Sequence, residues 1–211
     1  MNWGSSSRHA ITGFVTVSML VALAFSVTGC SASQSSESEV WLPSSVSEAL
    51  QIAKDHDLKF ETSVLQDGVI SSNEFEKAFD QYMDCAGELG YVFEPKYLDP
   101  VEGQLWRSIG TYEGAGEEPI NAEQECENRL SLIEAPYVLT TPKRMDPKLL
   151  SAFEECLTVK GISFTGNEVN FNDFAENDQS TSLGGSKFGC LQESMSKVFP
   201  DVVGYGISAN G

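Results

Sequence analysis

The sequence predicts a small, mainly α-helical domain with short strands, made of two related halves that are each stapled by a disulfide. An α+β arrangement is the alternative. Three observations support this fold class. Apolar residues recur at three- and four-residue steps in several segments, as on one face of a helix. Two of these segments match each other at a spacing of 71 residues, and each half carries two cysteines.

The two matching segments share the pattern aromatic-x-x-Cys-x4-Gly-x-x-Phe. The first runs from Tyr82 to Phe93 and the second from Phe153 to Phe164, with Cys85 and Cys156 at the shared position. Each lies at the end of a helical pattern, whose apolar positions are Phe75, Ala78, Phe79, Tyr82, Ala86 and Leu89 in the first and Leu149, Leu150, Phe153, Cys156 and Leu157 in the second. Chance similarity is the alternative to a true repeat.

Local signals mark where these two helices begin and end. Ser71 with Glu74 forms a capping box before the first helix. Asp146-Pro147 places a capping residue and then a proline at the start of the second. Gly90 and Gly161 follow the helices, where a left-handed residue commonly closes the last turn.

Each helix is expected to be followed by a short extended piece, a polar loop and a second cysteine-bearing helix. The second helices are predicted over 121–133, with Cys126, and over 186–198, with Cys190. The halves therefore span about 71–134 and 146–199. An earlier helix over 45–64 is expected to pack four apolar side chains against this pair: Val46, Leu50, Ala53 and Phe60.

The cysteines favour disulfides over metal or redox chemistry. Beyond Cys30 their number is even and no Cys-x-x-Cys pair occurs, as in exported disulfide proteins. Four cysteines allow three pairings, and the repeat favours Cys85–Cys126 and Cys156–Cys190. Each bridge would close a long loop, which stabilises the fold by about 4 kcal/mol on the chain-entropy model.

The first 30 residues read as a lipoprotein export signal. A polar start with Arg8 precedes an apolar stretch, Ala10 to about Val27, and the box Val27-Thr28-Gly29-Cys30 follows. We expect cleavage before Cys30 and acylation (palmitate and diacylglyceryl) of its thiol, which anchors the chain to a membrane. An uncut transmembrane anchor and an ordinary signal cut elsewhere are the alternatives.

The expected organisation has four parts. Residues 1–29 are the signal peptide, 30–44 a lipidated Ser-rich tether, 45–203 a single extracytoplasmic domain and 204–211 a flexible, Gly-rich tail. Trp41 is an apolar residue within the tether and could pack either on the domain or on lipid headgroups.

Several of these features together resemble a broad group of uncharacterised actinobacterial lipoproteins and secreted proteins. They are the box at Cys30, the Ser-rich tether, Asp67-Gly68-Val69-Ile70 before Glu74-Phe75, and the cysteine motif. The resemblance covers the export signal and residues 60–95, with an echo at 146–164. It implies an anchor in the outer leaflet of the bacterial cytoplasmic membrane, and it brings no activity or catalytic residues.

The charge of the chain narrows the choice of partners. With 31 acidic against 13 basic residues, the net charge is −18. Nucleic acids and anionic lipid surfaces are bound through clustered Lys and Arg, so neither is expected as a surface partner. Solubility, a cationic partner and loose binding of divalent ions are all compatible with this balance.

No constellation for catalysis or for a cofactor is recognised. Asp67 to Phe75 resembles the second half of a calcium loop, but Leu65 would then occupy a ligand position without an oxygen to offer, and Ser63 is a poor replacement for the leading aspartate. His56 lies in a polar stretch that reads as a solvated helix face, and Gly184-Gly185 reads as a turn. A carboxylate-pair glycosidase is not excluded by residue type alone. We therefore expect neither an enzyme nor a metal or cofactor site.

The candidate contact residues are Trp106 and Tyr112, in a stretch with strand-like alternation beside the acidic loop of Glu113 to Glu118. Core packing is the competing interpretation of both rings. The expected function is a non-catalytic, membrane-anchored module of the cell envelope that binds or scaffolds an envelope protein. An ion- or small-ligand-binding lipoprotein is the alternative.

Overall fold

The computed structural model describes residues 40–176 and 181–207, which belong to the unit Glu37–Gly211. The helices are α1 (Val46–Asp55), α2 (Lys59–Leu65), α3 (Ser72–Glu88), α4 (Ile120–Thr140), α5 (Pro147–Val159), α6 (Phe171–Glu176) and α7 (Thr181–Val198). The strands are β1 (Tyr91–Phe93), β2 (Tyr97–Leu98), β3 (Trp106–Arg107) and β4 (Gly110–Tyr112). The predicted class, mainly helical with short strands, is confirmed.

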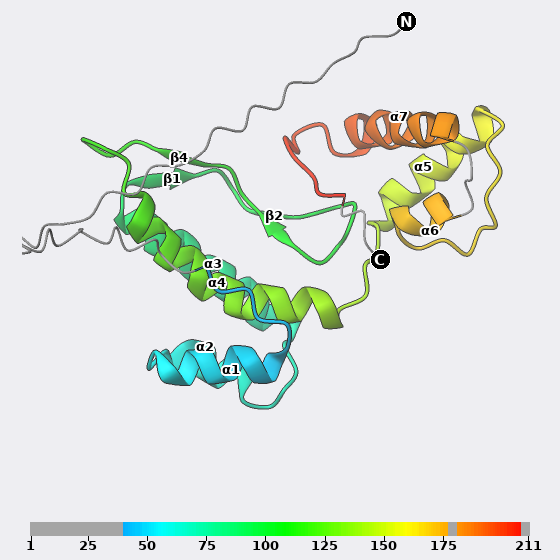
Figure 1. Cartoon of the computed structure of the whole chain (residues 1–211). Coiled ribbons are helices and arrows are strands. Elements are labelled where there is room, and N and C mark those ends of the chain that lie inside the picture. Colours follow the sequence, from blue (N-terminus) through cyan, green and yellow to red (C-terminus); the bar gives the residue numbers. More distant parts are fainter. Residues whose placement is uncertain (1–39, 177–180, 208–211) are drawn as a thin grey trace, which may run out of the picture. The chain divides into compact units, whose positions relative to one another are not determined.

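Two apolar clusters form the core, one in each half. The first is built by α1 to α4 around Phe75, Leu132 and Ile133, and the second by α5 to α7 around Phe153 and Leu191. Figure 1 shows α3 and α4 side by side, with the strands over one side of the pair and α1 and α2 on the other. The division into two cysteine-bearing halves therefore corresponds to two separate packing centres.

The first helical segment is broken, contrary to the single helix expected over 45–64. Asp57 adopts a positive φ of 55°, and α1 ends before it while α2 begins after Leu58. The break lets α2 fold back along α1, so that Ala53 and Val64 both reach the first core. Aspartate tolerates the left-handed conformation better than most residues, so this turn forms without a glycine. No glycine therefore marked its position in the sequence.

The local signals of α3 and α5 are confirmed. The Ser71 hydroxyl accepts a hydrogen bond from the Glu74 N–H, and the Glu74 carboxylate accepts one from the Ser71 N–H at 2.8 Å. Asp146 caps α5, with proline at its first position. Gly90 follows α3 with φ 103°, so the left-handed closure expected there is present.

The four strands form one irregular ribbon, Tyr91 to Tyr112, which we call the β ribbon. Its outer pair, β1 and β4, and its inner pair, β2 and β3, are both antiparallel. Between the pairs, the Glu94 N–H donates to the Ile109 carbonyl at 2.9 Å. The extended pieces expected after α3 and at 104–112 are thus the two arms of this ribbon.

Helix α4 is longer than the expected 121–133, because it continues through Pro136 to Thr140. Proline lacks the N–H that would bond to the carbonyl of Leu132, which normally ends a helix. Here Pro136 and Tyr137 are both buried, and the Tyr137 ring stacks on Phe75 with centroids 4.6 Å apart. Tertiary packing therefore overrides the local signal.

The second half departs from the expected helix–strand–loop–helix order. Among its described residues no strand follows α5, and the short helix α6 occupies the connection instead. The expectation of a turn at Gly184-Gly185 was also wrong, because α7 begins at Thr181 and includes both glycines. The repeat is therefore one of paired cysteine helices, with different connections.

Both predicted disulfides are present. Cys85 of α3 bonds to Cys126 of α4, and Cys156 of α5 bonds to Cys190 of α7. Each bridge joins the two principal helices of its half, since α3 with α4 and α5 with α7 are the most extensively packed helix pairs.

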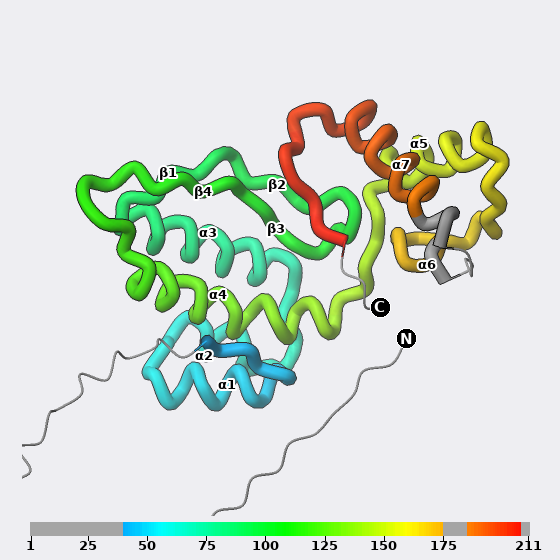
Figure 2. The backbone as a smooth tube through the Cα atoms, turned by 45° about the horizontal axis from the view of Figure 1, so that its top comes forward, coloured from blue at the N-terminus to red at the C-terminus, as the bar shows by residue number. Residues whose placement is uncertain are grey.

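The C-terminal segment after α7 is not a loose tail where it is described. The Tyr97 hydroxyl donates to the Gly204 carbonyl at 2.7 Å, and the Gly206 N–H donates to the Asp99 carboxylate at 2.6 Å. Figure 2 shows this segment running along the tip of the β ribbon. Tyr205 and Ile207 pack against the second core, which explains why a Gly-rich stretch is held. Residues 208–211 of the expected tail lie outside the described residues.

Within residues 40–176 and 181–207, no helix has the length and apolarity needed to cross a membrane.

Candidate functional site: a groove lined by aromatic rings and carboxylates

An open cavity of about 690 Å³ lies between the β ribbon and the helices α3 and α4. We call it the aromatic groove. Seven aromatic side chains line it: Phe79, Tyr82, Tyr91, Phe93, Tyr97, Trp106 and Tyr205. Its remaining walls include three carboxylates and one guanidinium, from Glu123, Glu127, Glu134 and Arg107. This volume is in the range of small-molecule binding sites in proteins.

The three carboxylates form a row along one face of α4. Positions 123, 127 and 134 are separated by four and seven residues, so at 100° per residue they lie within about 40° of each other around the helix. The far side of α4 carries the buried residues Asn128, Leu132 and Pro136, which lie about 120° or more around the helix from the middle of the row. Core packing therefore turns the acidic row toward the groove.

The pKa of the Tyr82 hydroxyl on α3 is affected by the proximity of this acidic row. Burial of the side chain, followed by the charges of Glu123, Glu127 and Glu134, raises the pKa of the Tyr82 hydroxyl to about 12. Burial and then the neighbouring Glu123 carboxylate raise the pKa of Glu127. Burial also raises the pKa of Glu134, although the Arg107 charge opposes it. The groove is thus short of positive charge.

Hydrogen-bond donors in the groove reach two of the three carboxylates: the Gln124 amide donates to Glu127 Oε2 at 3.2 Å, and the Tyr91 hydroxyl lies beside Glu123. The Tyr91 hydroxyl lies 2.6 Å from Glu123 Oε2 and 2.9 Å from Glu118 Oε1, yet it has one hydrogen and can serve only one carboxylate at a time. Burial, and then hydrogen bonding to Glu123 and Glu118, raises the Tyr91 pKa, so this hydroxyl keeps its proton. Among the described residues, Glu134 accepts no hydrogen bond.

The guanidinium of Arg107, which lines the groove, is already paired with a carboxylate. Arg107 Nε lies 2.6 Å from Asp99 Oδ2, and the Asp99 carboxylate is fully buried. The other Asp99 oxygen accepts hydrogen bonds from the Val101 and Glu102 N–H groups at the ribbon tip. Arg107 therefore neutralises Asp99 and leaves the acidic row of α4 largely uncompensated.

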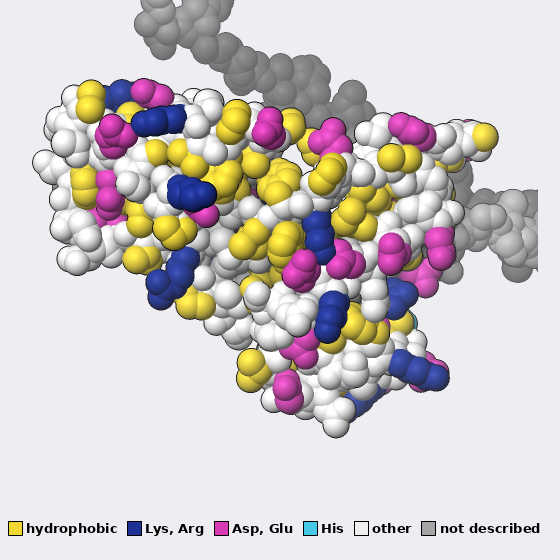
Figure 3. Space-filling view, turned by 180° about the vertical axis from the view of Figure 1, so that it is seen from behind, with side chains coloured by type: hydrophobic (Ala, Val, Ile, Leu, Met, Phe, Trp, Pro, Cys, Tyr) yellow, Lys and Arg dark blue, Asp and Glu magenta, His cyan; other side chains and the backbone are white. Residues whose placement is uncertain are grey.

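A second hollow, of about 490 Å³, adjoins the aromatic groove and shares Leu105, Arg107, Ser131 and Glu134 with it. Its other walls are mostly apolar and come from α4, the C-terminal segment and the residues before α1, at Leu42, Ala135, Val138, Leu139 and Ile207 among others. Figure 3, which views the molecule from behind, shows acidic side chains scattered among apolar and basic ones on the visible face.

The two predicted contact residues, Trp106 and Tyr112, are not brought together. Trp106 lines the groove from β3, and Lys96 Nζ lies 5.0 Å from the centroid of its ring. Lys96 is bound in turn by Glu76 and Asp80 of α3. Tyr112 packs on Tyr91 from β4, with ring centroids 5.4 Å apart, and does not line the groove.

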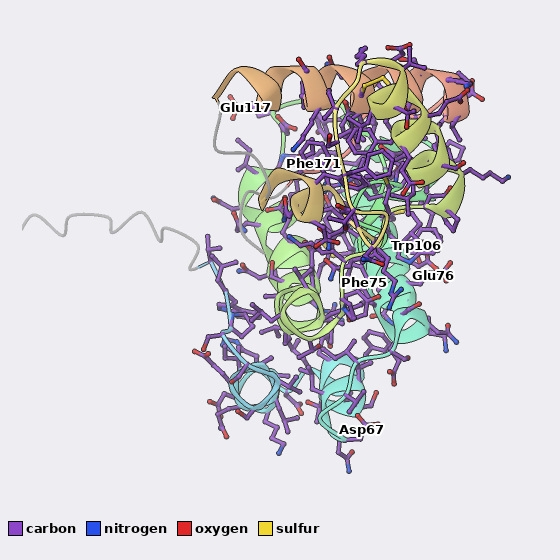
Figure 4. All side chains as sticks on the ribbon, turned by 90° about the vertical axis from the view of Figure 1, so that its right-hand side faces the viewer. Asp67, Phe75, Glu76, Trp106, Glu117 and Phe171 are labelled. Carbon is purple, nitrogen blue, oxygen red and sulfur yellow. A yellow bond between two sulfur atoms is a disulfide. The ribbon has the colours of Figure 1, made fainter. Side chains whose placement is uncertain are left out.

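The acidic loop of Glu113 to Glu118, expected beside both Trp106 and Tyr112, lies beside Tyr112 and not beside Trp106. The Tyr112 hydroxyl donates to the Glu117 carbonyl at 3.3 Å. Figure 4 shows Glu117 far from Trp106, whereas Glu76 lies next to Trp106. The expectation of one surface made of Trp106, Tyr112 and the acidic loop was therefore wrong in its geometry.

The other residues considered from the sequence have structural roles. The Asp67 carboxylate accepts from the Val69 N–H, and the Glu74 carboxylate serves the capping box, so the calcium-like segment is a turn followed by a helix cap. The His56 ring packs on Trp41 at 4.3 Å, and the Trp41 N–H donates to Asn128, which docks the end of the tether on the domain. In the part of the chain that the structure describes, no three metal-binding side chains gather.

Cys30 lies outside the described residues, so its lipidation stays a prediction. The acidic row of α4 was missed, although its helical spacing was visible in the sequence. Nothing in the sequence indicated that this face of α4 would lie opposite the aromatic side chains of the ribbon.

Searches against models of known protein families, curated proteins and solved structures found no match. The groove is therefore interpreted from its own residues.

Proposed function

We propose that this protein is a lipid-anchored, non-catalytic binding module of the bacterial cell envelope, and that its ligand occupies the aromatic groove. The observation that carries the proposal is the combination of volume and lining: about 690 Å³ with seven aromatic side chains. Aromatic rings supply large contact areas at low conformational cost and dominate many binding sites.

The location is proposed from the sequence. A cleavage box at Cys30 and a Ser-rich tether are expected to hold the domain outside the cytoplasmic membrane. The two disulfides of the domain fit an oxidising compartment. Envelope proteins and small envelope molecules are both within reach of a domain displayed in this way.

The test is retention of envelope components by the immobilised, oxidised full-length chain in detergent, followed by mass spectrometry of bound proteins and small molecules. The groove variant is Trp106→Leu, which keeps an apolar side chain against the first core. The matched control is Val159→Ala, on α5 outside the groove and 81% exposed. A component retained by the wild type and the control, but not by Trp106→Leu, supports the proposal. Equal retention by all three would refute the groove as the binding site.

A further inference from the structure

The lining of the aromatic groove defines the chemistry of what it can hold. A ligand must supply positive charge, because three carboxylates line the groove and its one guanidinium is paired with Asp99. Hydrogen-bond donors on the ligand would also find acceptors, because the Tyr91 hydroxyl has one hydrogen for Glu123 and Glu118 and the Gln124 amide makes a single hydrogen bond to Glu127. An ammonium group carries three donors and no acceptor, so it supplies both the charge and the donors.

The spacing of the row selects an elongated cation with more than one charge. Glu123 and Glu134 are eleven residues apart on α4, which is about 16 Å along a helix axis, with Glu127 between them. A compact single charge could contact one of these carboxylates, but it could not span the row. A chain of ammonium groups joined by short methylene segments could contact them in series.

The aromatic side chains opposite the row suit the remaining parts of such a molecule. Tyr82 and Phe93 pack edge to face with centroids 5.8 Å apart, and Tyr91 lies 6.5 Å from Phe93, so the rings form a continuous wall. Methylene groups gain from contact with such a surface. Ring faces also attract the ammonium groups themselves through cation–π interaction.

We propose that the aromatic groove binds a linear polyamine, with its ammonium groups distributed along the row Glu123, Glu127 and Glu134 and its methylene segments against the opposing rings. This inference rests on the proposed function and names its ligand class. A bare divalent ion fits less well, because no cluster of three metal-binding side chains occurs among the described residues.

The test is isothermal titration of the oxidised full-length chain with spermidine, at physiological salt in neutral detergent. The variants Glu127→Gln and Glu134→Gln keep the shape of each side chain and remove its charge. Both remove a carboxylate whose ionisation is disfavoured in the fold, so they should fold at least as well as the wild type. The matched control is Glu125→Gln, an exposed residue of α4 that does not line the groove.

We expect each groove variant to weaken spermidine binding by about tenfold, as for loss of one charge-assisted contact, and Glu125→Gln to change it less than about twofold. No binding by the wild type would overturn the proposal. Equal weakening of spermidine binding by all three variants would also overturn it. Displacement of bound spermidine by Mg²⁺ at the same concentration would do so too, since either result would indicate non-specific attraction to an acidic surface.

The two proposals can fail separately. If an envelope component is retained through the groove but spermidine neither binds nor displaces it, the binding module stands and the polyamine assignment falls. A basic protein segment would be one such component. If spermidine binds and the groove variants weaken it, the groove is a binding site even when the envelope extract yields no retained protein.

Discussion

At the residue scale, the acidic row of α4 shows how one position can favour binding at the expense of stability. Glu134 is partly buried near Tyr82, and the cation that acts on it among the described residues, Arg107, is committed to Asp99. Ionised carboxylates in such surroundings are costly unless a charge partner is present. Residues of this kind recur at functional sites, where stability is exchanged for a preformed charge.

We expect Glu134→Gln to raise the melting temperature at pH 7–8. The raised folded-state pKa means that the native state holds a proton more tightly than the unfolded state, so stability falls as pH rises through that pKa. Glutamine cannot ionise, so the variant does not lose this stability at high pH. The difference in melting temperature between the variant and the wild type should shrink toward pH 4, where the carboxyl group is also protonated in the unfolded chain. Differential scanning calorimetry between pH 4 and 8 measures it, with Glu125→Gln as control. A Glu134→Gln protein that melts lower at pH 8 would contradict the assignment.

At the scale of elements, Asp99 joins three parts of the chain. Its carboxylate accepts from the N–H groups at the ribbon tip, from Arg107 on β3 and from Gly206 of the C-terminal segment. A glycine is needed close by, because a side chain on Gly103 (φ 65°) would collide with the carbonyl oxygen of Arg144. One buried carboxylate thus sets the end of the β ribbon against the segment that follows α7.

We expect Asp99→Ala to lower the free energy of unfolding by about 3 kcal/mol, because it leaves the Arg107 charge and buried N–H groups without their partner. Urea denaturation measures the change. The control Asp84→Ala, exposed on α3, should stay within about 0.5 kcal/mol of the wild type. Equal stability of both variants would show that Asp99 is not needed to join these parts.

Elements with strong local signals were predictable and those set by tertiary contacts were not. The capping box at Ser71 and the turn at Gly90 depend on neighbouring residues, so the start and end of α3 could be predicted. The break at Asp57 and the passage of α4 through Pro136 depend on packing against the first core. The same holds for the candidate site. The helical spacing of the acidic row could be predicted from the sequence, whereas its position opposite the β ribbon depends on tertiary contacts and could not.

At the scale of the whole molecule, we expect the two disulfides to have similar roles in stability but unequal roles in the proposed binding. Their loops span 41 and 34 residues, so each stabilises the fold by about 4 kcal/mol on the chain-entropy model. Only Cys85–Cys126 joins the two helices that line the aromatic groove. Cys156–Cys190 joins helices of the other half.

We expect the double variant Cys85→Ser/Cys126→Ser to lose spermidine affinity by about tenfold or more, since the two walls are no longer fixed. Cys156→Ser/Cys190→Ser, with a comparable loss of stability, should bind almost as well as the wild type. Thermal melting establishes that both variants are folded, and titration compares them. Equal affinities of the two would disprove the special role of Cys85–Cys126.

We also expect Cys30→Ala to move the protein from the membrane fraction to the soluble fraction, and to abolish incorporation of labelled palmitate. The thiol is the predicted acceptor of the lipid, and serine residues of the tether cannot replace it. Cell fractionation with immunoblotting measures this distribution. Persistence of Cys30→Ala in membranes would favour an uncut anchor over a lipidated one.

The Cys85–Cys126 bridge also determines when the groove is complete. Tyr82 and Glu123 each precede one of these cysteines by about one helical turn, so the bridge sets the distance between facing walls. Thiols stay reduced in the cytoplasm. If the chain is exported as proposed, a newly made copy would therefore gain its full affinity only outside the cytoplasm, and copies still inside the cell would bind polyamines about tenfold more weakly.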